Sequence, residues 1–199
     1  MPDDYAQFHP KSLKAWRTWL EKNHAREKGI WLVYYKKETG KRAFSYDESV
    51  EEALCFGWID SLPRTLDQER SMLKFTVRKP KSVWSELNKQ RVERLIREKK
   101  MTPAGLQSIA IAKANGSWDT LSKTDEQART GEIPDDLRAA LSKNKTALEV
   151  FTAFPPSCRK QFLFWIDSAK REETRKSRIA QTVLMSAAKK KPGPQGFKL

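Results

Sequence analysis

The chain has few of the residues that build disulfide frameworks and metal sites. Its 199 residues include two cysteines and two histidines. Cys55 and Cys158 lie far apart, each within an apolar run, and no C-x-x-C pair occurs, so we expect both to be buried and unpaired. His9 and His24 share no metal-ligand spacing. The sequence therefore predicts neither a disulfide framework nor a metal site.

Long apolar runs and an export signal are also missing. A membrane-spanning helix needs about 18 or more consecutive apolar residues, and the sequence has no such stretch. The first four residues include Asp3 and Asp4, and no apolar run follows them, which is not the pattern of a signal peptide. We therefore expect no membrane insertion and a cytoplasmic location.

Recognisable catalytic signatures are absent as well. The sequence contains no G-x-S-x-G, no P-loop and no G-x-G-x-x-G. The adjacent carboxylates Glu51 and Glu52, like Asp135 and Asp136, would diverge on a helix, because neighbouring residues do not face one another there. We assign no catalytic residue and no cofactor. These absences favour a protein that is not an enzyme, without excluding one.

Basic residues are in excess, and they are concentrated in two parts of the chain. The formal net charge is +14. Residues 71–115 and residues 158–199 each carry 11 Lys or Arg and 3 Asp or Glu, whereas residues 1–70 have no net charge and residues 116–157 are slightly acidic. Such blocks attract anions, from small phosphates to nucleic acid, although basic helix faces are often merely solvated.

Hydrophobic patterning predicts an α+β protein. We expect a small mixed or antiparallel sheet flanked by helices, followed by an all-helical C-terminal module. Ser45 and Glu48 have the spacing of a capping box, and Thr102-Pro103 is a cap followed by proline at the first helical position. The expected helices cover residues 11–24, 45–57, 83–99 with Ser82 as cap, 102–114, 134–142, 144–154 and 157–188 with a break near Ala169; the expected strands cover 30–35, 58–62 and 72–78.

The strand at residues 72–78 alternates strictly. Leu73, Phe75 and Val77 point to one face, and Lys74, Thr76 and Arg78 point to the other. We expect it to form an antiparallel hairpin with the strand at 58–62, with one apolar face and one cationic face.

Composition divides the chain into four parts. These are an α/β domain with a basic Trp/Arg pocket over residues 1–115, a polar linker over 116–133, a helical module over 134–188 and a basic disordered tail over 189–199.

The helix expected at residues 83–99 carries a polar pair within its apolar stripe. Asn88 and Arg91 fall among Trp84, Leu87, Val92, Leu95 and Ile96, where an unpaired charge is costly to bury. In one interpretation the pair ties the helix to the hairpin, and Arg91 binds Asp60. In the other, the pair lines a pocket for an anionic or planar ligand. The predicted ligand-binding residues are Trp58, Asp60, Arg78, Lys79, Trp84, Asn88 and Arg91.

A second basic patch is predicted near the C-terminus. Arg171, Arg175 and Arg178 share one side of the last expected helix. In one interpretation they contact the same anionic partner. In the other, Arg175 and Arg178 form ion pairs with the nearby Glu172 and Glu173 or cover apolar surface with their stems.

Several strings of the sequence are long and unusual. Residues 55–61 read CFGWIDS, residues 74–88 read KFTVRKPKSVWSELN and residues 101–105 read MTPAG. The C-terminal part adds Trp165-Ile166, Ala169-Lys170, Glu173-Thr174-Arg175 and Arg178-Ile179. Over roughly residues 9–188 the chain resembles the YdeI/OmpD-associated family, also called bacteriocin-protection proteins. Val77 stands where the family string Phe-Thr-Pro-Arg has a proline.

The resemblance implies a bacterial, cytoplasmic protein linked to stress or bacteriocin protection, and it supplies no catalytic residues. The front part is also similar to small YdhG-like α/β domains, some of which resemble frataxin. An iron role would favour an acidic ridge, whereas this chain is basic.

Together these observations predict a non-enzymatic protein that binds an anionic small molecule, a polyanion or a protein partner. Two alternatives remain open. One is nucleic-acid binding through the two basic blocks, and the other is an enzyme acting on a phosphorylated or nucleotide-like substrate.

Overall fold

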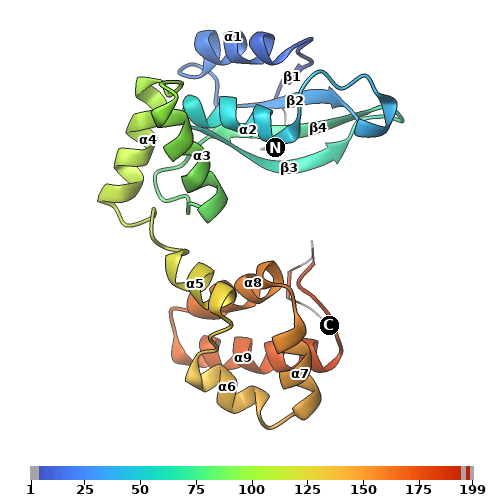
Figure 1. Cartoon of the computed structure of the whole chain (residues 1–199), viewed down its shortest axis with the longest axis vertical. Coiled ribbons are helices and arrows are strands. Elements are labelled where there is room, and N and C mark those ends of the chain that lie inside the picture. Colours follow the sequence, from blue (N-terminus) through green and yellow to red (C-terminus); the bar gives the residue numbers. More distant parts are fainter. Residues whose placement is uncertain (1–4, 194–195, 198–199) are drawn as a thin grey trace. The chain divides into compact units, whose positions relative to one another are not determined.

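The architecture is that of a computed structural model, which describes residues 5–193 and 196–197 (Figure 1). The chain divides into two compact units, Met1–Thr120 and Leu121–Leu199, which we call the front unit and the back unit. Within the described ranges, no helix has the length and apolar character needed to cross a membrane. The acidic residues 3 and 4 lie outside the described residues.

The front unit is built on a mixed sheet in which the strand order is β1-β2-β4-β3. The strands are β1 (Gln7–Phe8), β2 (Gly29–Tyr35), β3 (Trp58–Thr65) and β4 (Arg70–Val77). β1 is parallel to β2, and the other pairs are antiparallel, including the expected hairpin of β3 and β4. β1 is too short to show a hydrophobic alternation, which is why the sequence did not predict it.

The helices of the front unit begin where the local sequence provides caps. They are α1 (Leu13–Asn23), the 3-10 turn η1 (Lys37–Thr39), α2 (Tyr46–Cys55), α3 (Glu86–Arg97) and α4 (Pro103–Ala114). The capping box of Ser45 and Glu48 is formed, and Thr102 caps α4 as expected. α3 is capped by Ser85, not by Ser82, because Trp84 is buried on the extended segment before the helix.

The core of the front unit lies between one face of the sheet and the helices. Leu73 and Phe75 of β4 face α1, and Trp16 of α1 packs against Phe75 with ring centroids 5.4 Å apart. The indole of Trp16 also donates a hydrogen bond to the Ser49 carbonyl at 3.0 Å, which ties α1 to α2. In Figure 1, α3 and α4, drawn in green, lie beside one end of the sheet.

α4 is anchored to the end of α2 through a single carbonyl oxygen. The Thr102 hydroxyl and backbone N–H both donate to the Cys55 carbonyl, at 2.6 and 3.1 Å. Gly105 approaches the same oxygen so closely that a Cβ atom on it would lie 2.3 Å away. The contact leaves no room for a side chain at position 105.

The back unit is helical over its described residues. It contains α5 (Ser122–Thr130), α6 (Asp135–Leu141), α7 (Lys145–Ala153), α8 (Pro156–Asp167) and α9 (Glu172–Ala187). The break expected near Ala169 separates α8 from α9. Both cysteines are unpaired and buried, Cys55 in the front core and Cys158 in the back core. The small mixed sheet and the helical back unit confirm the α+β class.

The segment 116–133, which the sequence predicts to be a linker, contains helix α5. The buried side of α5 is made of Thr124, Gln127 and Ala128, which are small or polar and give no apolar periodicity. A helix that places polar side chains at buried positions is easily mistaken for a loop from composition alone.

The predicted disordered tail is partly ordered. Phe197 stacks on Trp165 of α8, with ring centroids 4.0 Å apart and ring planes 2° from parallel. An aromatic residue can form such a contact without any regular secondary structure. The rest of that prediction, at residues 194, 195, 198 and 199, lies outside the described residues.

We expect Gly105→Ala to destabilise the front unit by about 1–3 kcal/mol, although glycine-to-alanine changes inside helices usually stabilise. The added Cβ would collide with the Cys55 carbonyl. Urea unfolding followed by tryptophan fluorescence measures the effect, because six of the seven tryptophans lie in the front unit. Gly193→Ala is the control, since a Cβ there meets nothing within 4 Å. An unchanged midpoint for Gly105→Ala would contradict this account.

Candidate functional site

A hollow of about 530 Å³ lies beside the end of β4, and we call it the Arg78 pocket. Its walls are residues 24–28 after α1, residues 56–58 at the start of β3, residues 77–80 after β4, Trp84, and Ala104, Gln107, Ser108 and Ile111 of α4. The size is within the range of small-molecule sites.

The segment 77–80 forms one wall and is fixed at both ends. The Arg78 N–H donates to the Gly57 carbonyl at 2.9 Å, so the backbone is held by the start of β3. The Pro80 carbonyl accepts from the Asn115 amide at 2.8 Å and from the Ser117 hydroxyl at 3.1 Å. The residues that follow α4 therefore hold the far end of the segment.

Arg78 is buried in the wall with incomplete hydrogen bonding. Its guanidinium carbon lies 3.7 Å from the ring centroid of Trp84, and its Nη2 donates to the Val83 carbonyl at 2.5 Å. Its Nε and Nη1 have no hydrogen-bond partner and are covered from solvent, and the residue is only 8% exposed. Cation–π stacking is the principal interaction that holds this charge.

Burial disfavours the charged form of Arg78. It lowers the pKa of Arg78 to about 10, and the negative charge of Asp60 offsets part of this effect. The side chain therefore remains a cation at neutral pH.

The stack of Arg78 on Trp84 continues through a second indole. The rings of Trp84 and Trp118 have centroids 5.0 Å apart, and the ammonium groups of Lys113 and Lys89 lie 5.0 and 5.5 Å from the Trp118 ring centroid. The indole N–H of Trp84 is buried without a partner. Cations thus lie against both outer sides of a tryptophan pair.

Positive charge predominates around the pocket. Arg26, Lys28 and Lys79 also line it, and Glu27 is the one acidic residue among its described walls. A second hollow, of about 730 Å³, lies on the other side of the segment 77–80 and shares Lys28, Arg78 and Lys79 with the first. The buried guanidinium therefore lies between two open spaces.

The structure brings together four of the predicted ligand-binding residues. Trp58, Arg78, Lys79 and Trp84 all line the Arg78 pocket. Trp58 forms part of the pocket wall but has no free hydrogen-bond donor for a ligand. It is fully buried, and its indole N–H donates to the His24 carbonyl at 3.2 Å. The alternation of β4 predicts Arg78 on a cationic face and Val77 on an apolar face. In the structure Arg78 is buried, whereas Val77 is 44% exposed.

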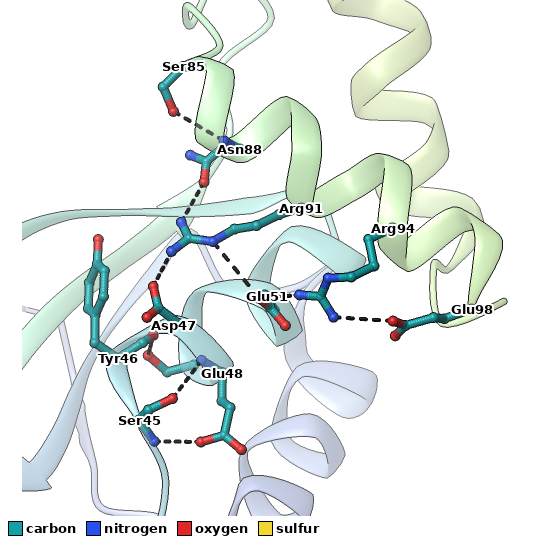
Figure 2. Close-up of polar contacts among 11 residues, drawn as sticks. Ser45, Tyr46, Asp47, Glu48, Glu51, Ser85, Asn88, Arg91, Arg94 and Glu98 are labelled. Atoms are coloured by element: carbon teal, nitrogen blue, oxygen red, sulfur yellow. Dashed lines mark hydrogen bonds and ion pairs between the residues drawn. The ribbon is translucent and has the colours of Figure 1, made fainter. Parts of the chain in front are cut away.

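Asn88 and Arg91 lie elsewhere, between α3 and α2. Figure 2 shows the Arg91 guanidinium bonded to the Asn88 side chain, at 2.8 Å, and to the carboxylate of Asp47, with the Glu51 carboxylate 4.0 Å from its Nε. The expected pair of Arg91 and Asp60 is not formed, because α3 lies along α2 and brings Arg91 to the first turn of that helix. The polar pair ties α3 to α2, not to the hairpin.

Asp60 is engaged by a different partner. It accepts a hydrogen bond from the Tyr46 hydroxyl at 2.7 Å. Burial, together with this bond to a carboxylate, raises the pKa of Tyr46. Asp60 thus acts on Arg78 through its charge and lies outside the walls of the pocket.

Several residues of the pocket were not singled out by sequence reasoning. Gln107 and Ser108 lie on the same face of α4 as Ala104 and Ile111, at helical spacings of three and four. Two polar residues within an otherwise apolar helix face are a sequence pattern that could have identified Gln107 and Ser108. His24 and Lys28 carried no such signal, because they lie in the irregular segment between α1 and β2.

Comparison with protein families assigns the two parts of the chain separately. Residues 8–108, half of the chain, match the family described as a domain of unknown function, DUF8412. Residues 130–189 match the family described as Bacteriocin-protection, YdeI or OmpD-Associated. The chain therefore belongs to the DUF8412 family, and its back unit matches the YdeI/OmpD-associated family over residues 130–189. Comparison with curated proteins and with solved structures gave no match.

The comparison confirms the resemblance to the YdeI/OmpD-associated family and limits it to residues 130–189. The front strings CFGWIDS and KFTVRKPKSVWSELN lie within the DUF8412 match, whereas Trp165-Ile166 and Arg178-Ile179 lie within the YdeI/OmpD-associated match. The Arg78 pocket is therefore a feature of the DUF8412 part.

The predicted second basic patch lies in the YdeI/OmpD-associated unit, and two of its arginines bind within that unit. Arg175 donates to Asp136 at 2.6 Å and to Asp167 at 2.8 Å. Arg178 donates to the Trp165 carbonyl and, at 2.8 Å, to the Ser168 hydroxyl. The expected pairs with Glu172 and Glu173 are not formed, because α6 and the end of α8 present carboxylates and carbonyls to this side of α9. Arg171 is exposed.

We expect Arg91→Met to reduce the stability of the front unit by about 1–2 kcal/mol, because it removes charge-assisted hydrogen bonds at a residue that is 7% exposed. Urea unfolding followed by tryptophan fluorescence measures this. Arg97→Met is the matched control, since Arg97 is exposed on the same helix. Equal stability of the two variants would rule out the role of Arg91 in joining α3 to α2.

We expect the contribution of Arg175 to the stability of the back unit to depend on pH. Hydrogen bonds from Arg175 lower the pKa of Asp136 below its ordinary value of 3.8. A lowered carboxyl pKa stabilises the fold at higher pH, and this stabilisation is lost as pH falls through the lowered pKa. Arg175→Met should therefore cost roughly 1 kcal/mol or less near neutral pH, with the difference shrinking below about pH 4.

Urea unfolding followed by far-ultraviolet circular dichroism at both pH values tests this expectation. The exposed neighbour provides the control variant, Arg171→Met. A difference for Arg175→Met that is the same at neutral and acidic pH would mean that the ion pair with Asp136 is not its source.

Proposed function

We propose that the front unit binds a small anionic ligand in the Arg78 pocket. The observation that carries this proposal is the buried guanidinium of Arg78, which has two unpartnered nitrogen atoms in the wall of a hollow. Such a group costs free energy in the unliganded fold, because a buried donor without an acceptor has lost its bonds to water. Most buried polar groups in native proteins have a hydrogen-bond partner, so the two unpartnered nitrogens of Arg78 are an exception that a bound anion would explain.

An anion supplies what the site lacks. A phosphate or carboxylate offers several acceptor oxygens to the N–H groups of an arginine and neutralises its charge. Since Nε and Nη1 are covered, Arg78 must turn out of its stack on Trp84 to meet the ligand, and the hollows on both sides of the segment 77–80 leave space for that rotation. Lys28 and Lys79 attract the ligand to the same place.

The distribution of free charge supports a site in the front unit. Arg175 and Arg178 of the second basic block bind carboxylates and carbonyls within the back unit. Fewer arginines of that block are therefore available to bind an anion than the sequence alone indicates. The charge near the Arg78 pocket is not neutralised in this way, since Glu27 is the acidic residue that its described walls contain.

A thermal-shift panel tests the proposal with the full chain. It contains inorganic phosphate, sulfate, mononucleotides, sugar phosphates, aromatic phosphates and short single-stranded DNA and RNA, each at low and high salt. A ligand that binds only the folded protein raises the melting temperature with its concentration. We expect at least one small anion to do so at both salt concentrations. Shifts limited to the polymers at low salt would instead support a general polyanion surface.

Arg78→Met provides the decisive variant. It keeps the stem that covers Trp84 and removes an incompletely bonded buried charge, so we expect it to be more stable than the natural protein by roughly 1 kcal/mol when no ligand is present. We expect it to show no shift with the anion that stabilises the natural protein. Arg97→Met is the control and should keep the shift. Loss of stability together with an unchanged shift would show that Arg78 serves the fold alone.

A further inference from the structure

We infer that the ligand of the Arg78 pocket is an aromatic anion, that is, a flat apolar ring that carries one phosphate or carboxylate group. This inference rests on the proposed function and adds the class of ligand. It follows from the division of the pocket walls into a cationic part and an apolar part.

The cationic part comes from two neighbouring segments, because Arg26 and Lys28 lie on one and Arg78 and Lys79 lie on the other. Arg78 and Lys79 follow β4, and Lys28 precedes β2, where its carbonyl accepts a hydrogen bond from Val77 at 3.4 Å. Because these three residues come from adjacent backbone, their charges gather near one place. A ligand with a single anionic group satisfies them without exposing further charge to the rest of the wall.

The remaining wall is apolar and partly open. Val77 and Ile111 line the pocket and are 44% and 38% exposed, so a ligand that fills the pocket would bury both side chains. Phe56 and Trp58 lie behind them and are buried. An inorganic anion would leave these apolar side chains exposed to water, whereas the aromatic ring of a ligand would cover them.

The pocket disfavours a sugar phosphate for the same reason. A sugar ring would place several hydroxyl groups against Val77, Ile111 and Phe56, where they lose their bonds to water. Gln107 and Ser108 can meet only a few of these groups, and the Ser108 hydroxyl already donates to the Gly105 carbonyl at 2.8 Å. A flat ring needs no such partners.

Isothermal titration calorimetry on the full chain with three probes tests the inference. Phenyl phosphate has both ring and anion, inorganic phosphate has the anion alone and phenol has the ring alone. We expect phenyl phosphate to bind at least about tenfold more tightly than either of the other two, because the ring buries apolar surface and the phosphate meets Arg78. Arg78→Met should abolish binding of phenyl phosphate.

Ile111→Ser examines the apolar wall separately from the charge. It should weaken phenyl phosphate several-fold and leave inorganic phosphate unchanged. Leu106→Ser is the matched control, since Leu106 is 45% exposed on the same helix and does not line the pocket. Equal weakening by the two variants would contradict the inference.

The outcomes separate the inference from the proposal beneath it. If inorganic phosphate binds as tightly as phenyl phosphate and both need Arg78, the anion site stands and the aromatic class is wrong. If no probe requires Arg78, the proposed function fails as well. If phenol binds as tightly as phenyl phosphate, the pocket takes apolar ligands, and both the anion and the aromatic anion are excluded.

Discussion

The stack of the Arg78 guanidinium on the Trp84 ring is the interaction on which the candidate site depends. Trp84 must be buried just before α3 begins, and this requirement moves the helix start to Ser85. The same indole rests on Trp118, which lies beyond the end of α4. One cation and two aromatic rings thereby join the end of β4, the start of α3 and the residues after α4. A pocket wall built in this way is stiff at Trp84 and adjustable at Arg78, because the arginine has several rotatable bonds and few hydrogen bonds to lose.

Arg78 has fewer hydrogen bonds than Arg91, Arg175 and Arg178. Arg91, Arg175 and Arg178 are each surrounded by carboxylates or carbonyls of neighbouring helices. These arginines join neighbouring helices, and few of their N–H groups remain available for a ligand. The contrast shows why counting basic residues is a weak indicator of function. Arg78 and Arg91 belong to the same basic block, yet the packing of the chain engages them very differently.

Sequence patterns predicted most helices and strands, because these depend on local spacing. The capping box at Ser45, the cap at Thr102 and the alternation in β4 each rest on residues a few positions apart. Helix α5 escaped prediction since its buried side uses Thr124, Gln127 and Ala128, and the pairing of Phe197 with Trp165 involves residues far apart in the chain. For the candidate site, local strings singled out Arg78 and Trp84, and the structure places both in the wall of one pocket. The partner of Arg91 could not be predicted, because it depends on how α3 lies along α2.

The position of Trp118 has a practical consequence for dividing the chain. Composition suggests that a shortened front domain should stop at residue 115, where the polar segment begins. A fragment cut there would lack Ser117 and Trp118, and with them a bond to the Pro80 carbonyl and the cover on one face of Trp84. The uncovered indole of Trp84 would be an apolar patch that promotes aggregation of the fragment. The wall of the pocket would also lose the support of Trp118. A fragment that extends to Thr120 keeps both, so the end chosen for a recombinant front unit decides whether the candidate pocket keeps its support.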